Sequence, residues 1–101
     1  MMKIRIKFRK YGTMKFIGHL DVMRYFQKAI RRSEVNIRYS EGFSPHQIMS
    51  FAAPLGVGIT SKGEYVDIEV LDTENSKKMI DRLNAVMSES FEILEYKLLP
   101  D

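Results

Sequence analysis

The stretch that decides the fold is KIRIKFRK, residues 3–10, in which charged and apolar residues alternate from Lys3 to Arg9. Successive side chains of a β-strand point to opposite faces, so a period of two predicts a half-buried strand. Its apolar members, Ile4, Ile6 and Phe8, are expected in the core. The outer face would carry four cations, Lys3, Arg5, Lys7 and Arg9.

Beyond this strand the apolar spacing becomes helical. Apolar residues recur at intervals of three or four over residues 19–33, which predicts an amphipathic helix. The expected apolar stripe is Leu20, Met23, Phe26 or Gln27, and Ile30. Away from that stripe the same helix places four cations along one side, Arg24, Lys28, Arg31 and Arg32. A second amphipathic helix is predicted after the capping side chains of residues 72–76, up to about Ser90.

Four further segments favour strands. Residues 35–40 are short and β-prone, residues 47–55 would add an extra short strand that ends at Pro54, and residues 64–71 alternate again. Residues 91–99 are also β-compatible. This order predicts an α+β fold, a ferredoxin-like split βαβ sandwich (βαββαβ with an extra short strand) whose antiparallel sheet carries two helices on one face.

In that topology the first and third main strands are central neighbours. The cations of the first strand would then lie beside Asp67 and Glu69, and cross-strand ion pairs would neutralise part of their charge. Sheet-face RNA readers usually stack bases on exposed aromatic side chains, and only Tyr65 is a good candidate for that role. The surplus cations nevertheless make RNA or another polyanion a candidate ligand.

The charge of the chain is unevenly distributed. The 16 Lys and Arg against 13 Asp and Glu give a formal net charge of +3, but residues 1–47 hold eleven of the cations and only three of the acids. Such asymmetry suggests an anionic partner for the first half. The chain contains no cysteine, which excludes disulfides, thiolate zinc sites and cysteine-ligated iron–sulfur clusters within it. No segment has the pattern of a signal peptide or a membrane span, so a cytoplasmic location without membrane contact is expected.

Two histidines are the main candidates for proton transfer. His19 stands at the start of the first predicted helix, where it and Asp21 are also consistent with an ordinary polar helix start. His46 follows Pro45 in a loop rich in turn formers, and Tyr39 precedes that loop. A metal site built from His19, Asp21 and His46 would lack any diagnostic spacing, so no metal site is predicted.

Several blocks of sequence carry a resemblance to a known family. The blocks are KYG (10–12), FIGHLDVMR (16–24), RR (31–32), YSEGFSPH (39–46), SFAAPLGVG (50–58) and GEY (63–65). Over residues 3–71 they resemble the radical-SAM-linked domain of unknown function, a bacterial family. Among the most specific is the block that we call the motif loop, with Tyr39, Ser40, Gly42, Phe43, Ser44, Pro45 and His46. Family members are about twice as long, so the resemblance implies that residues 1–101 form a single domain corresponding to the N-terminal half of theirs.

The resemblance implies a radical SAM protein as partner, in trans or fused, and a gene neighbourhood with E/G-type ribonuclease and ribosomal proteins. A chain without cysteine cannot hold the three-cysteine cluster of radical SAM chemistry, so it would be an accessory domain with no cofactor of its own. The leading hypothesis is a non-catalytic domain that binds RNA or a ribosome-related substrate, with the motif loop supplying specificity. The proposed contacts are Lys3, Arg5, Lys7, Arg9, Arg24, Lys28, Arg31 and Arg32.

Two alternatives stay open. The strand order is also similar to that of RAMP-type CRISPR RNA-processing proteins, which suggests a metal-independent endoribonuclease. In that case His19 or His46 would act as general acid or base, assisted by Tyr39 or Lys28. The other alternative is a protein-docking module whose acidic second half contacts the partner enzyme.

Overall fold

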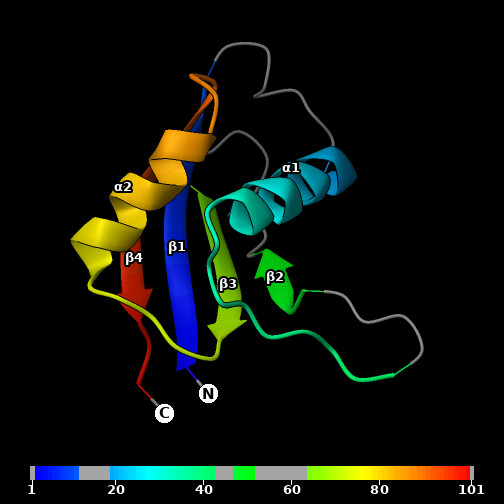
Figure 1. The fold of residues 1–101 in the computed structure, drawn as a ribbon. Coiled ribbons are helices and arrows are strands. Elements are labelled where there is room, and N and C mark those ends of the chain that lie inside the picture. Colours follow the sequence, from blue (N-terminus) through cyan, green and yellow to red (C-terminus); the bar gives the residue numbers. More distant parts are fainter. Residues whose placement is uncertain (1, 12–18, 43–46, 52–63, 101) are drawn as a thin grey trace.

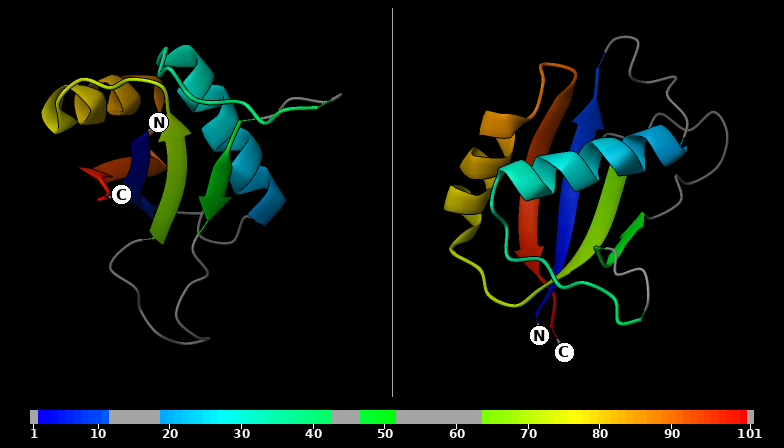
Figure 2. Two further views of the ribbon diagram at one scale, coloured as in Figure 1. Left: turned by 90° about the horizontal axis from the view of Figure 1, so that it is seen from below. Right: turned by 45° about the vertical axis from the view of Figure 1, so that its right-hand side comes forward.

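The computed structural model describes residues 2–11, 19–42, 47–51 and 64–100 of the chain. Their elements are β1 (Met2–Lys10), α1 (His19–Arg32), β2 (Met49–Phe51), β3 (Glu64–Val70), α2 (Ser76–Val86) and β4 (Phe91–Leu98). In these ranges the strands form a four-stranded sheet of order β2-β3-β1-β4, in which every neighbouring pair is antiparallel. Both helices cover the same face of this sheet (Figure 1, Figure 2). The α+β prediction is confirmed, including β1 and β3 as central neighbours.

The alternation in β1 places its apolar residues in the core as predicted. Ile4, Ile6 and Phe8 are buried, and the Phe8 ring lies 4.5 Å from that of Phe26 on α1. The helices and β3 contribute Ile30, Val66, Ile68, Val70, Met79 and Leu83 to the same core, and β4 adds Phe91, Ile93 and Tyr96. This core explains why both helices lie on one face, because the opposite face of β1 bears only charged side chains.

The predicted apolar stripe of α1 is wrong at its beginning. Leu20 is 66% exposed, whereas Val22, Phe26 and Ala29 are buried with Ile30. These four positions follow the i, i+4, i+7, i+8 spacing of a core-facing helix stripe. The stripe is therefore rotated relative to the prediction, and the helix ends at Arg32.

The predicted strand over residues 35–40 is also wrong. In the described part of the chain this segment forms only isolated bridges, from Ile37 to Val70 and from Tyr39 to Gln47. The edge strand is β2 instead, inside the range predicted for the extra short strand; residues 52–55 of that prediction lie outside the described residues. The chain leaves α1 through Glu34, whose φ of 59° lies in the left-handed region.

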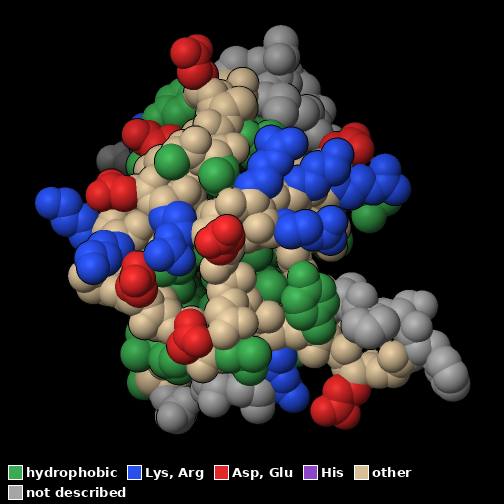
Figure 3. All heavy atoms as spheres, viewed as in Figure 1, with side chains coloured by type: hydrophobic (Ala, Val, Ile, Leu, Met, Phe, Trp, Pro, Cys, Tyr) green, Lys and Arg blue, Asp and Glu red, His purple; other side chains and the backbone are tan. Residues whose placement is uncertain are grey.

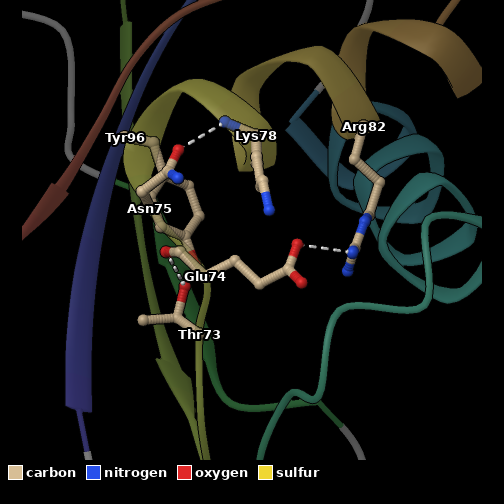
Figure 4. Close-up of polar contacts among 6 residues, drawn as sticks. All are labelled: Thr73, Glu74, Asn75, Lys78, Arg82 and Tyr96. Atoms are coloured by element: carbon tan, nitrogen blue, oxygen red, sulfur yellow. Dashed lines mark hydrogen bonds and ion pairs between the residues drawn. The ribbon is translucent and has the colours of Figure 1, made fainter.

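α2 begins as predicted and ends earlier than predicted. Its N-cap is Asn75, whose side-chain oxygen accepts the Lys78 N–H at 2.9 Å (Figure 4). The helix was expected to reach about Ser90, but it ends at Val86 because Met87 has extended backbone angles and donates its N–H to the Asn84 carbonyl. No helix in the described ranges is both long and apolar enough to span a membrane.

Candidate nucleic-acid interface

The open face of the sheet, opposite the helices, holds an ion pair between its two central strands. Arg5 of β1 donates from Nε and Nη2 to the two carboxylate oxygens of Asp67 on β3, at 2.9 and 3.0 Å. This two-pronged hydrogen bond and the charge of Asp67 raise the pKa of Arg5. Arg5 is thus hydrogen-bonded to a carboxylate on the neighbouring strand that neutralises its charge.

The other cations of this face also lie beside acids. Lys3 stands opposite Glu69 of β3, while β4 places Glu95 opposite Lys7 and Glu92 opposite Arg9. β3 supplies Asp67 and Glu69 to this face, and β4 doubles the number of acids there and adds one cation, Lys97. Among the described residues β1, β3 and β4 place five cations and four acids on the open face, and Arg38, which pairs with Glu69 at 3.5 Å, adds a sixth cation, so the net charge of this face is small.

Tyr65 is a poorer stacking platform than its exposure suggests. Its side chain lies on the open face opposite Lys7, and it is 37% exposed. The Lys7 ammonium nitrogen is 6.0 Å from the centre of the Tyr65 ring, at the limit of a cation–π contact. A base stacked on this ring would have to displace that ammonium group.

The four cations of α1 form a different kind of surface, which we call the α1 ridge: Arg24, Lys28, Arg31 and Arg32. All four are exposed, and blue side chains gather along α1 in Figure 3. None of the four forms an ion pair within the described parts of the chain. Twelve of the thirteen Asp and Glu residues belong to those parts, since only Asp101 falls outside them. Among the described residues the α1 ridge is consequently the main concentration of uncompensated positive charge.

The proposed catalytic residues are only partly described. Tyr39 is 45% exposed, and its backbone forms an isolated antiparallel β-bridge with Gln47. His19 is the first residue of α1, but the position of its side chain lies outside what the structure describes, as does all of His46. The proposed proton-transfer site therefore stays a prediction. Among the described residues no group of three His, Cys, Asp or Glu side chains could hold a metal ion.

The motif loop is described only at its start. Ser40 is half-buried, and Gly42 has a φ of +121°, which side-chain-bearing residues rarely adopt. The remaining members, Phe43, Ser44, Pro45 and His46, lie outside the described residues. Just after them Gln47 is buried, and its Nε2 donates to the Gln27 carbonyl of α1 at 3.2 Å. This link between α1 and the residue that follows the motif loop has no signal in the sequence.

Comparison with known proteins gives a family without an assigned activity. A family model described as "Uncharacterized protein conserved in bacteria (DUF2344)" matches residues 3–101. This match includes α2 and β4, which the blocks quoted from the sequence did not reach. No curated protein and no solved structure matches the chain.

Proposed function

The chain belongs to this uncharacterized bacterial family, and we propose that it is a non-catalytic binding domain that holds RNA or a ribosome-related substrate for a radical SAM enzyme. The observation that carries the proposal is the α1 ridge, because its cations are exposed and unpaired within the described residues. Clustered Lys and Arg make most protein contacts to nucleic-acid phosphates. The strand order and the one-sided helices support keeping the ferredoxin-like assignment as part of the same proposal.

The stability of the helix does not account for the α1 ridge. Arg31 and Arg32 lie in the last turn, where cations interact favourably with the helix dipole, but Arg24 and Lys28 lie before it. Arg24 and Lys28, and likewise Lys28 and Arg32, are like-charged pairs four residues apart. Each such pair destabilises a helix by about 0.2–0.5 kcal/mol. An anionic ligand would relieve this repulsion, which favours a binding role.

The absence of cysteine supports an accessory role beside a partner enzyme. A radical SAM cluster needs cysteine ligands, so that chemistry would have to reside in another chain or domain. Co-purification with a candidate radical SAM protein tests the partnership. Deleting residues 72–101 would remove Met79 and Leu83 from the core, so the test should use the exposed acids Glu89 and Glu92 instead. If Glu89→Gln and Glu92→Gln abolish co-purification, the protein-docking alternative gains support.

A salt series of RNA binding tests the proposal. For a single-stranded oligonucleotide, each phosphate contact contributes about −0.7 to the slope of log affinity against log salt concentration, so four contacts predict a slope of about −2.8. Replacing all four cations of the α1 ridge by Gln should flatten the slope almost completely. A matched control removes four cations from the open face and leaves the Arg5–Asp67 pair intact: Lys3→Gln, Lys7→Gln, Arg9→Gln and Lys97→Gln.

We expect the control to retain most of the affinity, because Lys3, Lys7 and Arg9 stand opposite acids and Lys97 is paired with Glu95 on the same strand. Equal losses in the two variants would show that net charge alone controls binding and would refute a role specific to the α1 ridge. A parent protein with no salt-dependent RNA binding would refute the nucleic-acid proposal altogether. Incubating the same RNA in chelator then separates binding from cleavage. We expect intact RNA; cleavage that is lost in His19→Ala or His46→Ala would support the endoribonuclease alternative.

A further inference from the structure

A pocket of about 280 Å³ opens between α1 and the end of α2. We propose that this interhelix pocket binds one nucleotide of a single-stranded RNA, with its phosphate at Lys28 and Arg32 and its base against Val86 and Met87. The inference rests on the proposed function, because it assigns a specific nucleotide site at one end of the α1 ridge. The lining residues are Tyr25, Lys28, Ala29 and Arg32 from α1, with Val86, Met87 and Ser88.

One wall of the interhelix pocket is suited to an anion. Lys28 and Arg32 are four residues apart on α1, which places their Cβ atoms about 5–6 Å from each other, so both side chains can reach one phosphate. Neither is paired with an acid among the described residues, and no acid lines the pocket. Glu89, the nearest acid in sequence, lines a neighbouring surface depression that shares Met87 and Ser88 with the interhelix pocket, and it does not line the pocket itself. The Lys28–Arg32 wall therefore keeps its full positive charge.

The opposite wall is suited to a flat, weakly polar group. Val86 and Met87 are half-buried, so their side chains present an apolar surface with restricted movement. The last carbonyl groups of α2 lie on this side and carry partial negative charge, which disfavours a phosphate here. A ligand with one anionic end and one flat apolar end fits both walls, and a nucleotide has this construction.

Tyr25 connects the two walls and holds them at a set separation. Its ring is stacked on Phe91 of β4, with centroids 4.3 Å apart and planes 17° from parallel. Its hydroxyl oxygen accepts the Ser88 N–H at 2.6 Å. The segment after α2 is thereby tied to α1, so the interhelix pocket is formed before any ligand enters.

The size of the pocket favours a single nucleotide. Small-molecule sites in proteins usually enclose roughly 300–1,000 Å³, and the interhelix pocket lies just below that range. It is therefore too small for a dinucleotide. The rest of the α1 ridge, Arg24 and Arg31, would hold neighbouring phosphates of the same strand without forming a pocket.

The test compares two double variants that remove the same charge from the α1 ridge. Lys28→Ala with Arg32→Ala removes the cations of the pocket, whereas Arg24→Ala with Arg31→Ala removes cations outside it. The probes are adenosine 5′-monophosphate, adenosine and inorganic phosphate, titrated separately while the backbone amide signals of Met87 and Ser88 are followed by NMR. A single-stranded RNA is titrated in parallel.

We expect adenosine 5′-monophosphate to shift the two amide signals at lower concentration than adenosine or phosphate does. Loss of a charge-assisted hydrogen bond costs about tenfold in affinity or more, so the pocket variant should bind the mononucleotide at least tenfold more weakly. The variant outside the pocket should stay close to the parent. Both variants should flatten the RNA salt slope by a similar amount, about 1.4, because each loses two phosphate contacts.

A second pair of variants tests the pocket without touching the α1 ridge. Ser88→Glu places a carboxylate at the exposed rim, and Ala85→Glu places one on an exposed position three residues earlier that does not line the pocket. Only Ser88→Glu should weaken mononucleotide binding. If the mononucleotide leaves the Met87 and Ser88 signals unchanged, or if the paired variants respond equally, the pocket assignment is refuted while RNA binding by the parent can still be intact. Absence of RNA binding by the parent would remove the proposed function and this site together.

Discussion

Asn84 links α2 to the sheet through two side-chain hydrogen bonds to the backbone of β4. Its side-chain oxygen accepts the Ile93 N–H at 2.8 Å, and its side-chain nitrogen donates to the Ile93 carbonyl at 3.2 Å. β4 is an edge strand, so these two backbone groups of Ile93 have no neighbouring strand to pair with. The side-chain amide of Asn84 therefore provides the two hydrogen bonds that a neighbouring strand would otherwise provide.

We predict that Asn84→Ala lowers the free energy of unfolding by about 1.5 kcal/mol. Each of the two partly buried hydrogen bonds contributes a net 0.5–1.5 kcal/mol or so, and the higher helix propensity of Ala returns roughly 0.5 kcal/mol. For a domain of this size the melting temperature should fall by about 6–12 °C. Urea and thermal denaturation followed by circular dichroism measure both quantities.

Two further variants make the test specific. Asn84→Asp keeps an acceptor for the Ile93 N–H but sets a carboxylate against the Ile93 carbonyl, so it should destabilise at least as much as Asn84→Ala. Lys77→Ala changes an exposed position of the same helix and should alter stability by less than about 0.5 kcal/mol. If Asn84→Ala and Lys77→Ala give equally small losses, the two hydrogen bonds do not stabilise the domain and the reasoning fails.

Three other residues give independent predictions. Glu34→Gly should raise the unfolding free energy by about 0.5–1 kcal/mol, because Glu34 has a φ of 59° that costs a side-chain-bearing residue more than glycine; a loss in urea denaturation would contradict this. Tyr25→Phe should cost about 1 kcal/mol in the same assay, because the Ser88 N–H loses its acceptor, and no change would show that water replaces it. Burial raises the pKa of Tyr96, so its contribution to stability is complete below the unfolded-state pKa of about 10 and is lost as pH rises through the higher folded-state pKa. Tyr96→Phe should flatten the alkaline decline in melting temperature, and an unchanged decline would refute this assignment.

The loop that leads into α2 shows how local signals and tertiary contacts combine. The sequence indicated capping side chains over residues 72–76, and the structure selects Asn75 for that role. Around it Glu74 pairs with Arg82 at 2.8 Å, and the Thr73 hydroxyl lies 2.7 Å from that of Tyr96 on β4 (Figure 4). The helix start was therefore predictable from nearby residues, but the contact to β4 was not.

Predictions that depend on distant pairing failed for a common reason. Residues 35–40 have β-prone side chains, yet a strand also needs a continuous partner, and β3 is paired on that side with β2. The sequence predicts too long an α2, because the helix ends where Met87 adopts extended backbone angles and donates its N–H to the Asn84 carbonyl. The rotated stripe of α1 has a similar origin, because packing against the sheet decides which face of the helix is buried. Leu20 lies outside that face and is exposed.

By itself the sequence determined both helices, the three longer strands β1, β3 and β4, the core face of β1 and the basic side of α1. These properties follow from periods of two and of about 3.6 residues, which are local consequences of backbone geometry. Only the tertiary structure decided which cations lie beside acids, because Glu92 and Glu95 stand opposite Arg9 and Lys7 on a strand more than eighty residues away. It likewise decided the interhelix pocket, whose two walls come from segments that meet only when both helices pack on the same sheet face. Charge and shape at a surface depend on neighbours in space, which a single sequence does not specify.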